Sequence, residues 1–82
     1  MDYTIRTADQ LEPILKAFRK SKGLSQIELS KKMGVSQQAL SLLESSPHRA
    51  SFERILSVLA SLGVEVILRE KEGAPQPAPS QW

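Results

Sequence analysis

Apolar residues recur at helical spacing in a short segment near the middle of the chain. In residues 26–33, Leu29 and Met33 lie one turn apart, on the face expected to be buried. Ser25 precedes this segment and Glu28 follows three residues later. This is the pattern of a capping box, in which each side chain accepts from a free backbone N–H at the helix start. We therefore predict a helix over residues 26–33.

A glycine joins this segment to a second one of the same kind. Gly34 suits a helix end because glycine adopts the left-handed backbone conformation without a Cβ penalty. Ser36 is placed to cap the next helix, which is predicted over residues 37–44. Its inward face is expected to hold Ala39, Leu40 and Leu43, and its outward face Gln37, Gln38, Ser41 and Leu42.

Two longer helices are predicted on either side of this pair. The first covers residues 8–22, with Thr7 and Gln10 as a second capping box, and Pro13 should offset or kink its first turn. The second covers residues 52–62. The expected apolar faces are Leu11, Ile14, Leu15 and Phe18 in the first, and Phe52, Ile55, Leu56, Leu59, Ala60 and Leu62 in the second.

Residues 64–68 follow a different period, because apolar positions alternate there, and this predicts a β-strand. Its backbone groups need a partner. Tyr3 and Ile5 hint at a short N-terminal strand in the same chain, and the other solution is the same strand from a second copy. We favour the second copy, which gives a two-fold dimer closed by a small sheet of Val64, Val66, Ile67 and Leu68.

The composition changes after residue 72. Residues 73–82 are rich in proline, alanine, serine and glutamine, and such a segment cannot bury a core. We therefore expect one folded domain at residues 1–72 and a disordered tail. The tail holds Trp82, the single tryptophan, which is either an anchor for a partner's pocket or a residue without such a role.

Length, composition and charge narrow the class of protein. A chain of 82 residues is enough for one small domain, which buries a modest core and often gains stability from dimerisation. The absence of cysteine excludes disulfides and thiolate zinc sites, and no membrane span or signal peptide is visible, so we expect a cytoplasmic protein. The net charge is +2, with eight basic against five acidic residues up to residue 49 and three against four afterwards.

The second short helix opens with side chains that suit DNA bases. Glutamine pairs in two places with adenine in the major groove, and serine donates to or accepts from several bases. Two short helices joined by a glycine turn, with such side chains at the start of the second, form the layout of a helix-turn-helix DNA reader. The alternative is a solvated face on a helical protein-interaction module. The outward glutamines and the basic first half favour DNA.

The chain lacks the pattern of a catalytic or metal site. No nucleophile lies at a recognisable spacing from a histidine, and there is no phosphate-binding loop. His48 is the single histidine and cannot build a metal site alone. We expect no enzymatic activity, no metal and no cofactor.

Residues 11–62 resemble the Cro/C1-type, or lambda-repressor-like, helix-turn-helix domain. The segment SLGVEVILRE after the last helix, with a short polar tail that ends in tryptophan, resembles HipB-like antitoxins. The resemblance implies a mainly α fold of four to five helices, with C-terminal strands that form a shared sheet in a homodimer. It also implies binding to palindromic operator DNA, repression of the protein's own operon, and a HipA-type serine/threonine kinase toxin as partner.

The resemblance also assigns roles to individual residues. Base reading falls on Ser36, Gln37, Gln38 and Ser41. Phosphate contacts fall on Ser25, Gln26, Lys32, Ser45, His48 and Arg49, and Trp82 is the candidate toxin contact. Relatives have a basic residue where this chain has Ser36, so a different operator is expected. The predicted function is a dimeric repressor that doubles as an antitoxin. The alternative is a stand-alone phage-type or restriction-controller regulator without a toxin.

Overall fold

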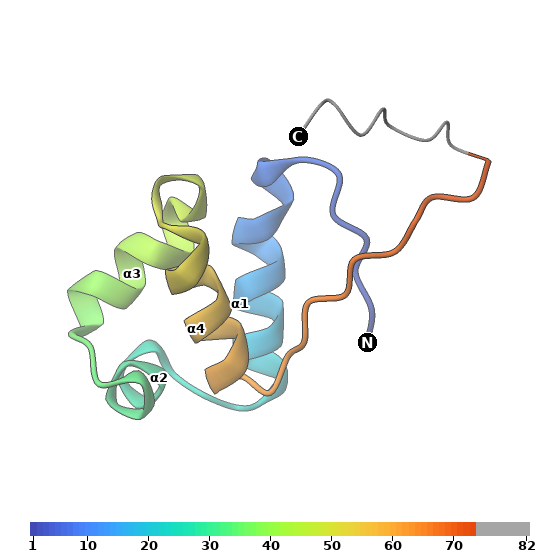
Figure 1. Ribbon diagram of the computed structural model, residues 1–82. Helices are drawn as coiled ribbons and strands as arrows, with labels where there is room; N and C mark the ends of the chain where they lie inside the picture. Colours follow the sequence, from blue (N-terminus) through green and yellow to red (C-terminus); the bar gives the residue numbers. More distant parts are fainter. Residues whose placement is uncertain (74–82) are drawn as a thin grey trace.

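The computed structural model describes residues 1–73. In chain order they form the 3-10 helix η1 (Ala8–Gln10), then α1 (Leu11–Ser21), α2 (Gln26–Met33), α3 (Gln37–Ser45), the 3-10 helix η2 (Pro47–Arg49) and α4 (Phe52–Ser61) (Figure 1). The predicted mainly helical class is confirmed. Residues 74–82, which hold Trp82 and most of the predicted tail, lie outside the described residues.

Both short helices begin at their predicted capping serines, and α2 ends at its predicted glycine. Ser25 Oγ accepts from the Glu28 N–H at 3.1 Å, and a Glu28 carboxylate oxygen accepts from the Ser25 N–H at 3.1 Å. Gly34 ends α2 with a φ of 75°, the left-handed conformation expected of it. Ser36 Oγ caps α3 by accepting from the Ala39 N–H at 3.1 Å, and α3 runs one residue further than predicted, to Ser45.

The start of α1 is offset, as Pro13 predicts. The first turn is the separate 3-10 helix η1, and Pro13 is the third residue of α1. N–H groups in a first turn have no intrahelical acceptor, so proline removes no hydrogen bond there. The Gln10 side chain closes this end by accepting from the Thr7 N–H at 3.0 Å and donating to the Thr4 carbonyl at 3.1 Å.

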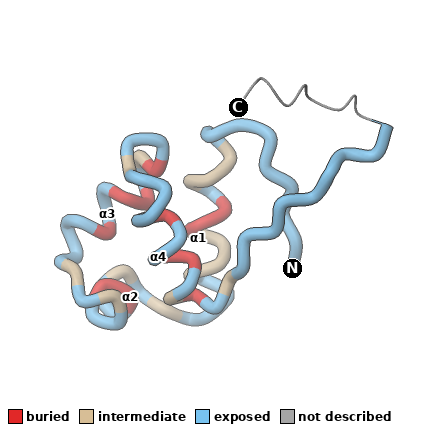
Figure 2. Tube along the Cα trace, viewed as in Figure 1, coloured by how far each residue is buried: buried red, intermediate tan, exposed pale blue. Residues whose placement is uncertain are grey.

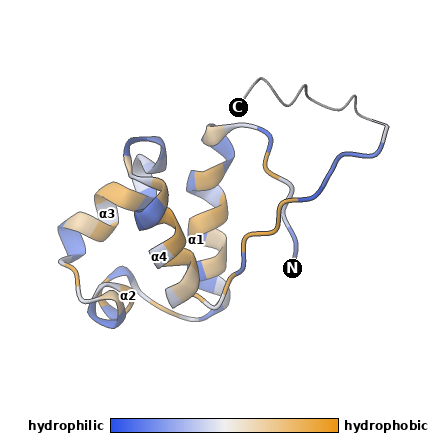
Figure 3. Cartoon of the chain, in the orientation of Figure 1, coloured by the Kyte–Doolittle hydropathy of each residue, from blue (hydrophilic) through white to orange (hydrophobic). Residues whose placement is uncertain are grey.

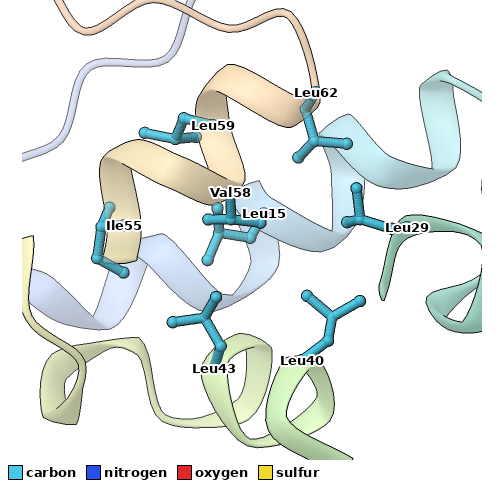
Figure 4. Close-up of a cluster of buried hydrophobic side chains, with 8 residues drawn as sticks. All are labelled: Leu15, Leu29, Leu40, Leu43, Ile55, Val58, Leu59 and Leu62. Carbon is cyan, nitrogen blue, oxygen red and sulfur yellow. The ribbon is translucent and has the colours of Figure 1, made fainter. Parts of the chain in front are cut away.

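All four α-helices contribute side chains to one core, in which α4 packs against the other three (Figure 4). The core consists of Leu15, Leu29, Leu40, Leu43, Ile55, Val58, Leu59 and Leu62. Half-buried apolar residues surround it, among them Phe18, Leu24, Met33, Val35, Ala50 and Val64. The core therefore fixes the positions of α2 and α3 relative to each other, because both pack on the same side chains of α1 and α4.

Several burial predictions are wrong. On α4, Phe52 is 66% exposed, Leu56 is 41% exposed and Ala60 is also exposed, whereas Val58 is fully buried (Figure 2). The helix has two apolar stripes, and only the one that includes Val58 faces the core of this chain. On α3, Ala39 is exposed rather than buried.

The described residues contain no β-strand. Val64 still packs on the core and donates its N–H to the Leu59 carbonyl at 2.8 Å, but residues 64–71 have no regular structure. The N-terminal segment, residues 1–6, also lacks a strand, and Tyr3 instead packs edge-on against Phe18 with ring centroids 5.2 Å apart. A strand requires a paired neighbour. The shared sheet of a dimer therefore stays a prediction.

Candidate nucleic-acid interface

The outward face of α3 carries polar side chains with unused hydrogen-bonding capacity. Gln37, Gln38 and Ser41 are all exposed, and their side chains make no hydrogen bond within residues 1–73. On the opposite face, Leu40 and Leu43 hold the helix to the core. The helix is therefore fixed from behind, while its outward amides and hydroxyl are available to a ligand.

The two capping serines differ in their remaining hydrogen-bonding capacity. Ser25 and Ser36 each accept a backbone N–H, and the hydroxyl hydrogen of Ser36 remains able to donate to a ligand oxygen, whereas the Ser25 hydroxyl also interacts with the Glu28 carboxylate. The backbone N–H of Ser25, followed by its side chain, lowers the pKa of Glu28 below the ordinary value of 4.5. Glu28 is thus ionised at neutral pH, and its carboxylate caps the start of α2 by accepting the Ser25 N–H.

A buried ion pair that we did not predict connects three helices. Glu44 on α3 is 1% exposed, and its carboxylate accepts from Arg19 Nε at 2.7 Å and from Arg19 Nη2 at 3.3 Å. Arg19 also donates to the Leu24 carbonyl at 2.9 Å, and Gln26 Nε2 on α2 donates to Glu44 at 3.2 Å. The ion pair therefore ties α3 to α1, to the α1–α2 turn and to the first residue of α2.

The sequence did contain a signal for this pair. Glu44 follows Leu40 by four residues, and Arg19 follows Leu15 by four, so both charged side chains occupy positions of the buried helical stripe. A buried charge is stable when it is paired and hydrogen-bonded. Two opposite charges on two inward faces therefore indicate an ion pair between the helices.

The structure separates the three candidate phosphate contacts at the end of α3 and in η2. Ser45 and His48 line a hollow of about 260 Å³ together with Asp9 and Glu12, whose carboxylates would repel phosphate. Arg49 lies on another hollow, of about 230 Å³, whose lining includes Leu42 and a second cation, Arg54. Of these three candidates, Arg49 therefore has the surroundings that best suit phosphate.

The remaining candidates lie on α2, which packs directly against α3. Lys32 is exposed in the last turn of α2, next to Lys31, and Gln26 is half-buried in the first turn. Contacts from both ends of α2 and from the start of α3 would fix the orientation of a duplex, because phosphate contacts set the position of a protein on DNA.

Other classes of site find no support among residues 1–73. Within that range no group of three histidine, cysteine, aspartate or glutamate residues could hold a metal ion. No helix in the described part is long and apolar enough to cross a membrane. The capped pair of helices, with a polar outward face on the second, defines a helix-turn-helix DNA-binding domain.

Comparison with known proteins identifies the same helix-turn-helix class and then a particular family within that class. The family described as Helix-turn-helix matches residues 15–68. The chain is 32% identical over 78 residues to Antitoxin HipB of Escherichia coli O6:H1 (strain CFT073), which covers 94% of this chain and 83% of the relative. The chain therefore belongs to the HipB-like family of DNA-binding helix-turn-helix antitoxins.

Solved structures with the same fold carry related names. A HipB–O1–O2 complex matches with a TM-score of 0.76 and 29% identity, and covers 84% of this chain and 100% of its own. A HipA–HipB–O2–O3 complex matches with a TM-score of 0.77 and 28% identity, and the match covers 87% of this chain and 100% of the other. A HipB–O4 20mer complex matches with the same TM-score, identity and coverage of both chains.

Proposed function

We propose that the chain is a dimeric repressor that reads a palindromic operator with α3, represses its own operon, and neutralises a HipA-type kinase toxin. The observation that carries the DNA-reading part is the outward face of α3. Three polar side chains are exposed there without hydrogen-bond partners within residues 1–73, on a helix that is capped at its start and held to the core from behind. Such a rigid, unsatisfied face suits the edges of bases in a major groove.

The proposed roles divide between base reading and positioning. Gln37, Gln38 and Ser41 read base edges, together with Ser36, whose hydroxyl hydrogen remains free beside the cap. Phosphate contacts come from Ser25, Gln26, Lys32 and Arg49, with smaller contributions from Ser45 and His48 because two carboxylates line their hollow. Phosphate contacts give affinity and salt dependence, and base contacts give sequence choice.

The exposed apolar residues support a homodimer. Phe52, Leu56 and Ala60 form a stripe on α4, here called the outer stripe, and apolar residues continue into the segment after α4, where Ile67 is 68% and Leu68 is 94% exposed (Figures 2 and 3). Exposed apolar surface of this kind marks an interaction site. A second copy would cover the outer stripe and pair the predicted strand of Val64, Val66, Ile67 and Leu68.

The toxin partnership is supported by the names of the relatives. The curated relative is an antitoxin, and one solved relative is a complex of HipA with HipB, O2 and O3. A relative that occurs in one complex with HipA, O2 and O3 fits this proposal. Trp82 is the proposed toxin contact, because tryptophan is among the side chains best suited to fill a pocket on a partner.

A native pull-down from the source cells tests the toxin partnership. Three baits separate the parts of the proposal: the full chain, its Trp82→Ala variant, and a chain that ends at Gly73. We expect the full chain to recover a kinase-sized protein encoded beside its gene, and both altered baits to recover less. Recovery of only DNA and a second copy by the full chain would contradict the antitoxin role and leave a stand-alone repressor. Equal recovery by all three baits would remove the role of Trp82.

A further inference from the structure

The buried carboxylate of Glu44 bonds to a residue at the proposed DNA interface as well as to its counter-ion. Arg19 occupies both carboxylate oxygens, at 2.7 and 3.3 Å, and is itself held by the Leu24 carbonyl at 2.9 Å. The oxygen that receives the longer Arg19 bond also accepts from Gln26 Nε2 at 3.2 Å. Arg19 therefore orients the carboxylate, and with it the oxygen that accepts from Gln26.

The chemistry of the amide determines how Gln26 lies. An ionised carboxylate only accepts hydrogen bonds, so the NH₂ group of Gln26 must face Glu44 and its carbonyl oxygen must face away. One hydrogen of that NH₂ group is used by Glu44. Within residues 1–73 the side chain makes no other hydrogen bond, so its second N–H remains available. Gln26 is half-buried at the first position of α2, where this N–H can reach a ligand at the surface.

We infer that Glu44 is a positioning residue for DNA binding, which acts by orienting the Gln26 amide towards a phosphate. The inference rests on the proposed function, in which Gln26 contacts the DNA backbone. Glu44 lies on the inner side of α3, the helix whose outer side carries Gln37 and Ser41. One carboxylate therefore holds the phosphate contact from α2 in a fixed relation to the base-reading face of α3.

A purely structural ion pair would stabilise the fold without acting through Gln26, so the test must separate the two roles. Removing Glu44 alone would leave Arg19 buried without its counter-ion and would destabilise the domain. Replacing both partners, with Arg19→Met and Glu44→Leu together, removes the charges but keeps the buried volume. Such paired replacements are often neutral or stabilising. In this paired variant Gln26 loses its acceptor while the helices remain packed.

The experiment is a double-mutant cycle between the paired variant and Gln26→Ala, with affinity measured for a duplex selected by the intact chain from a randomised pool. We expect the paired variant to bind roughly fivefold to tenfold more weakly than the intact chain. In the Gln26→Ala background the same replacement should have no further effect, because the residue through which Glu44 acts is gone. Equal losses in both backgrounds, or no loss in the intact background, would overturn the inference.

A second measurement on the DNA-free chain tests the contact itself. In nuclear magnetic resonance spectra, the Gln26 side-chain proton that is donated to Glu44 should exchange with water more slowly than the second proton of the same amide, and this protection should disappear in the paired variant. Unchanged Gln26 protons in the paired variant would show that Glu44 does not hold the amide. If the selection from the randomised pool yields no duplex at all, the proposed DNA reading fails, while this spectrum still decides whether Glu44 orients Gln26.

Discussion

Lys32 is exposed in the last turn of α2, whereas Lys16 on α1 is paired with Glu12 at 3.8 Å. The two residues carry the same charge but differ in the proposed role, because only Lys32 is proposed to contact phosphate. At the scale of single residues, such a difference separates a DNA contact from an ordinary surface cation. Each phosphate contact releases counter-ions from DNA and so contributes to the dependence of binding on salt.

We expect Lys32→Ala to weaken binding to specific and random duplexes alike. The slope of log affinity against log salt should fall by about one, because one phosphate contact is lost. Fluorescence anisotropy over a salt series measures this slope. Lys16→Ala is the matched control and should leave the slope unchanged. A slope that is the same in Lys32→Ala as in the intact chain would remove Lys32 from the interface.

The sequence predicted which side chains of α3 are exposed better than it predicted the buried contacts that hold this helix in place. Helical spacing gave the outward positions of Gln37, Gln38 and Ser41 correctly, because α3 is short and its buried side is apolar. It missed Glu44, since an isolated pattern of apolar positions treats a glutamate as solvated although the structure buries it beside Arg19. Burial of a charge depends on a partner 25 residues away, which spacing within one helix cannot supply.

At the scale of elements, the limits of the helices were well predicted because caps are local. The side chains of Ser25 and Ser36 and the backbone of Gly34 determine them from a few neighbouring residues. The core-facing side of α4 was harder to predict. That helix has two apolar stripes, and only packing against α1, α2 and α3 selects the stripe of Val58 over the outer stripe.

The turn between α2 and α3 gives a prediction about stability. Gly34 has a φ of 75°, and a Cβ added there would meet nothing within 4 Å. The effect of a substitution is therefore one of backbone conformation alone. We expect Gly34→Ala to lower the free energy of unfolding by about 1–2 kcal/mol, and Gly34→Asn to lower it less, because asparagine tolerates this conformation. Urea unfolding measures both; equal losses for alanine and asparagine would contradict this explanation.

The cap of α2 gives a prediction about pH. Hydrogen bonds from Ser25 lower the pKa of Glu28, so this cap stabilises the fold above the ordinary carboxyl pKa, and the contribution is lost as the pH falls through the lowered value. Ser25→Ala removes the side-chain partner but keeps the backbone N–H. We expect the pKa of Glu28 to rise part of the way towards 4.5 in this variant. Carboxyl titration by nuclear magnetic resonance checks this, and an unchanged pKa would show that the Ser25 hydroxyl does not stabilise the ionised Glu28 carboxylate.

At the scale of the whole molecule, the described chain leaves apolar surface uncovered. The outer stripe and the segment that contains Ile67 and Leu68 are exposed after all four helices have packed. The sequence predicted a strand in that segment, but no part of residues 1–73 pairs with it, and the described residues contain no strand. A second copy would explain both the exposed apolar surface and the unpaired segment, because it would cover the first and pair with the second.

Leu56→Glu tests this explanation, because it would bury a carboxylate in the apolar interface that the outer stripe is proposed to form. We expect the variant to sediment as a monomer at concentrations where the intact chain is a dimer. Ser57→Glu adds the same charge at the neighbouring exposed position and should remain dimeric. A dimer that survives Leu56→Glu would exclude the outer stripe from the interface.

The central claim is that α3 reads bases, and the most direct test compares two proteins on two duplexes. The intact chain and Gln37→Ala are titrated on the DNA directly upstream of the gene and on a shuffled duplex of the same composition. We predict that the upstream duplex binds the intact chain more tightly, and that Gln37→Ala lowers this binding by about 1–3 kcal/mol while binding to the shuffled duplex barely changes. Equal losses on both duplexes, or equal affinity of the intact chain for both, would contradict base reading by α3.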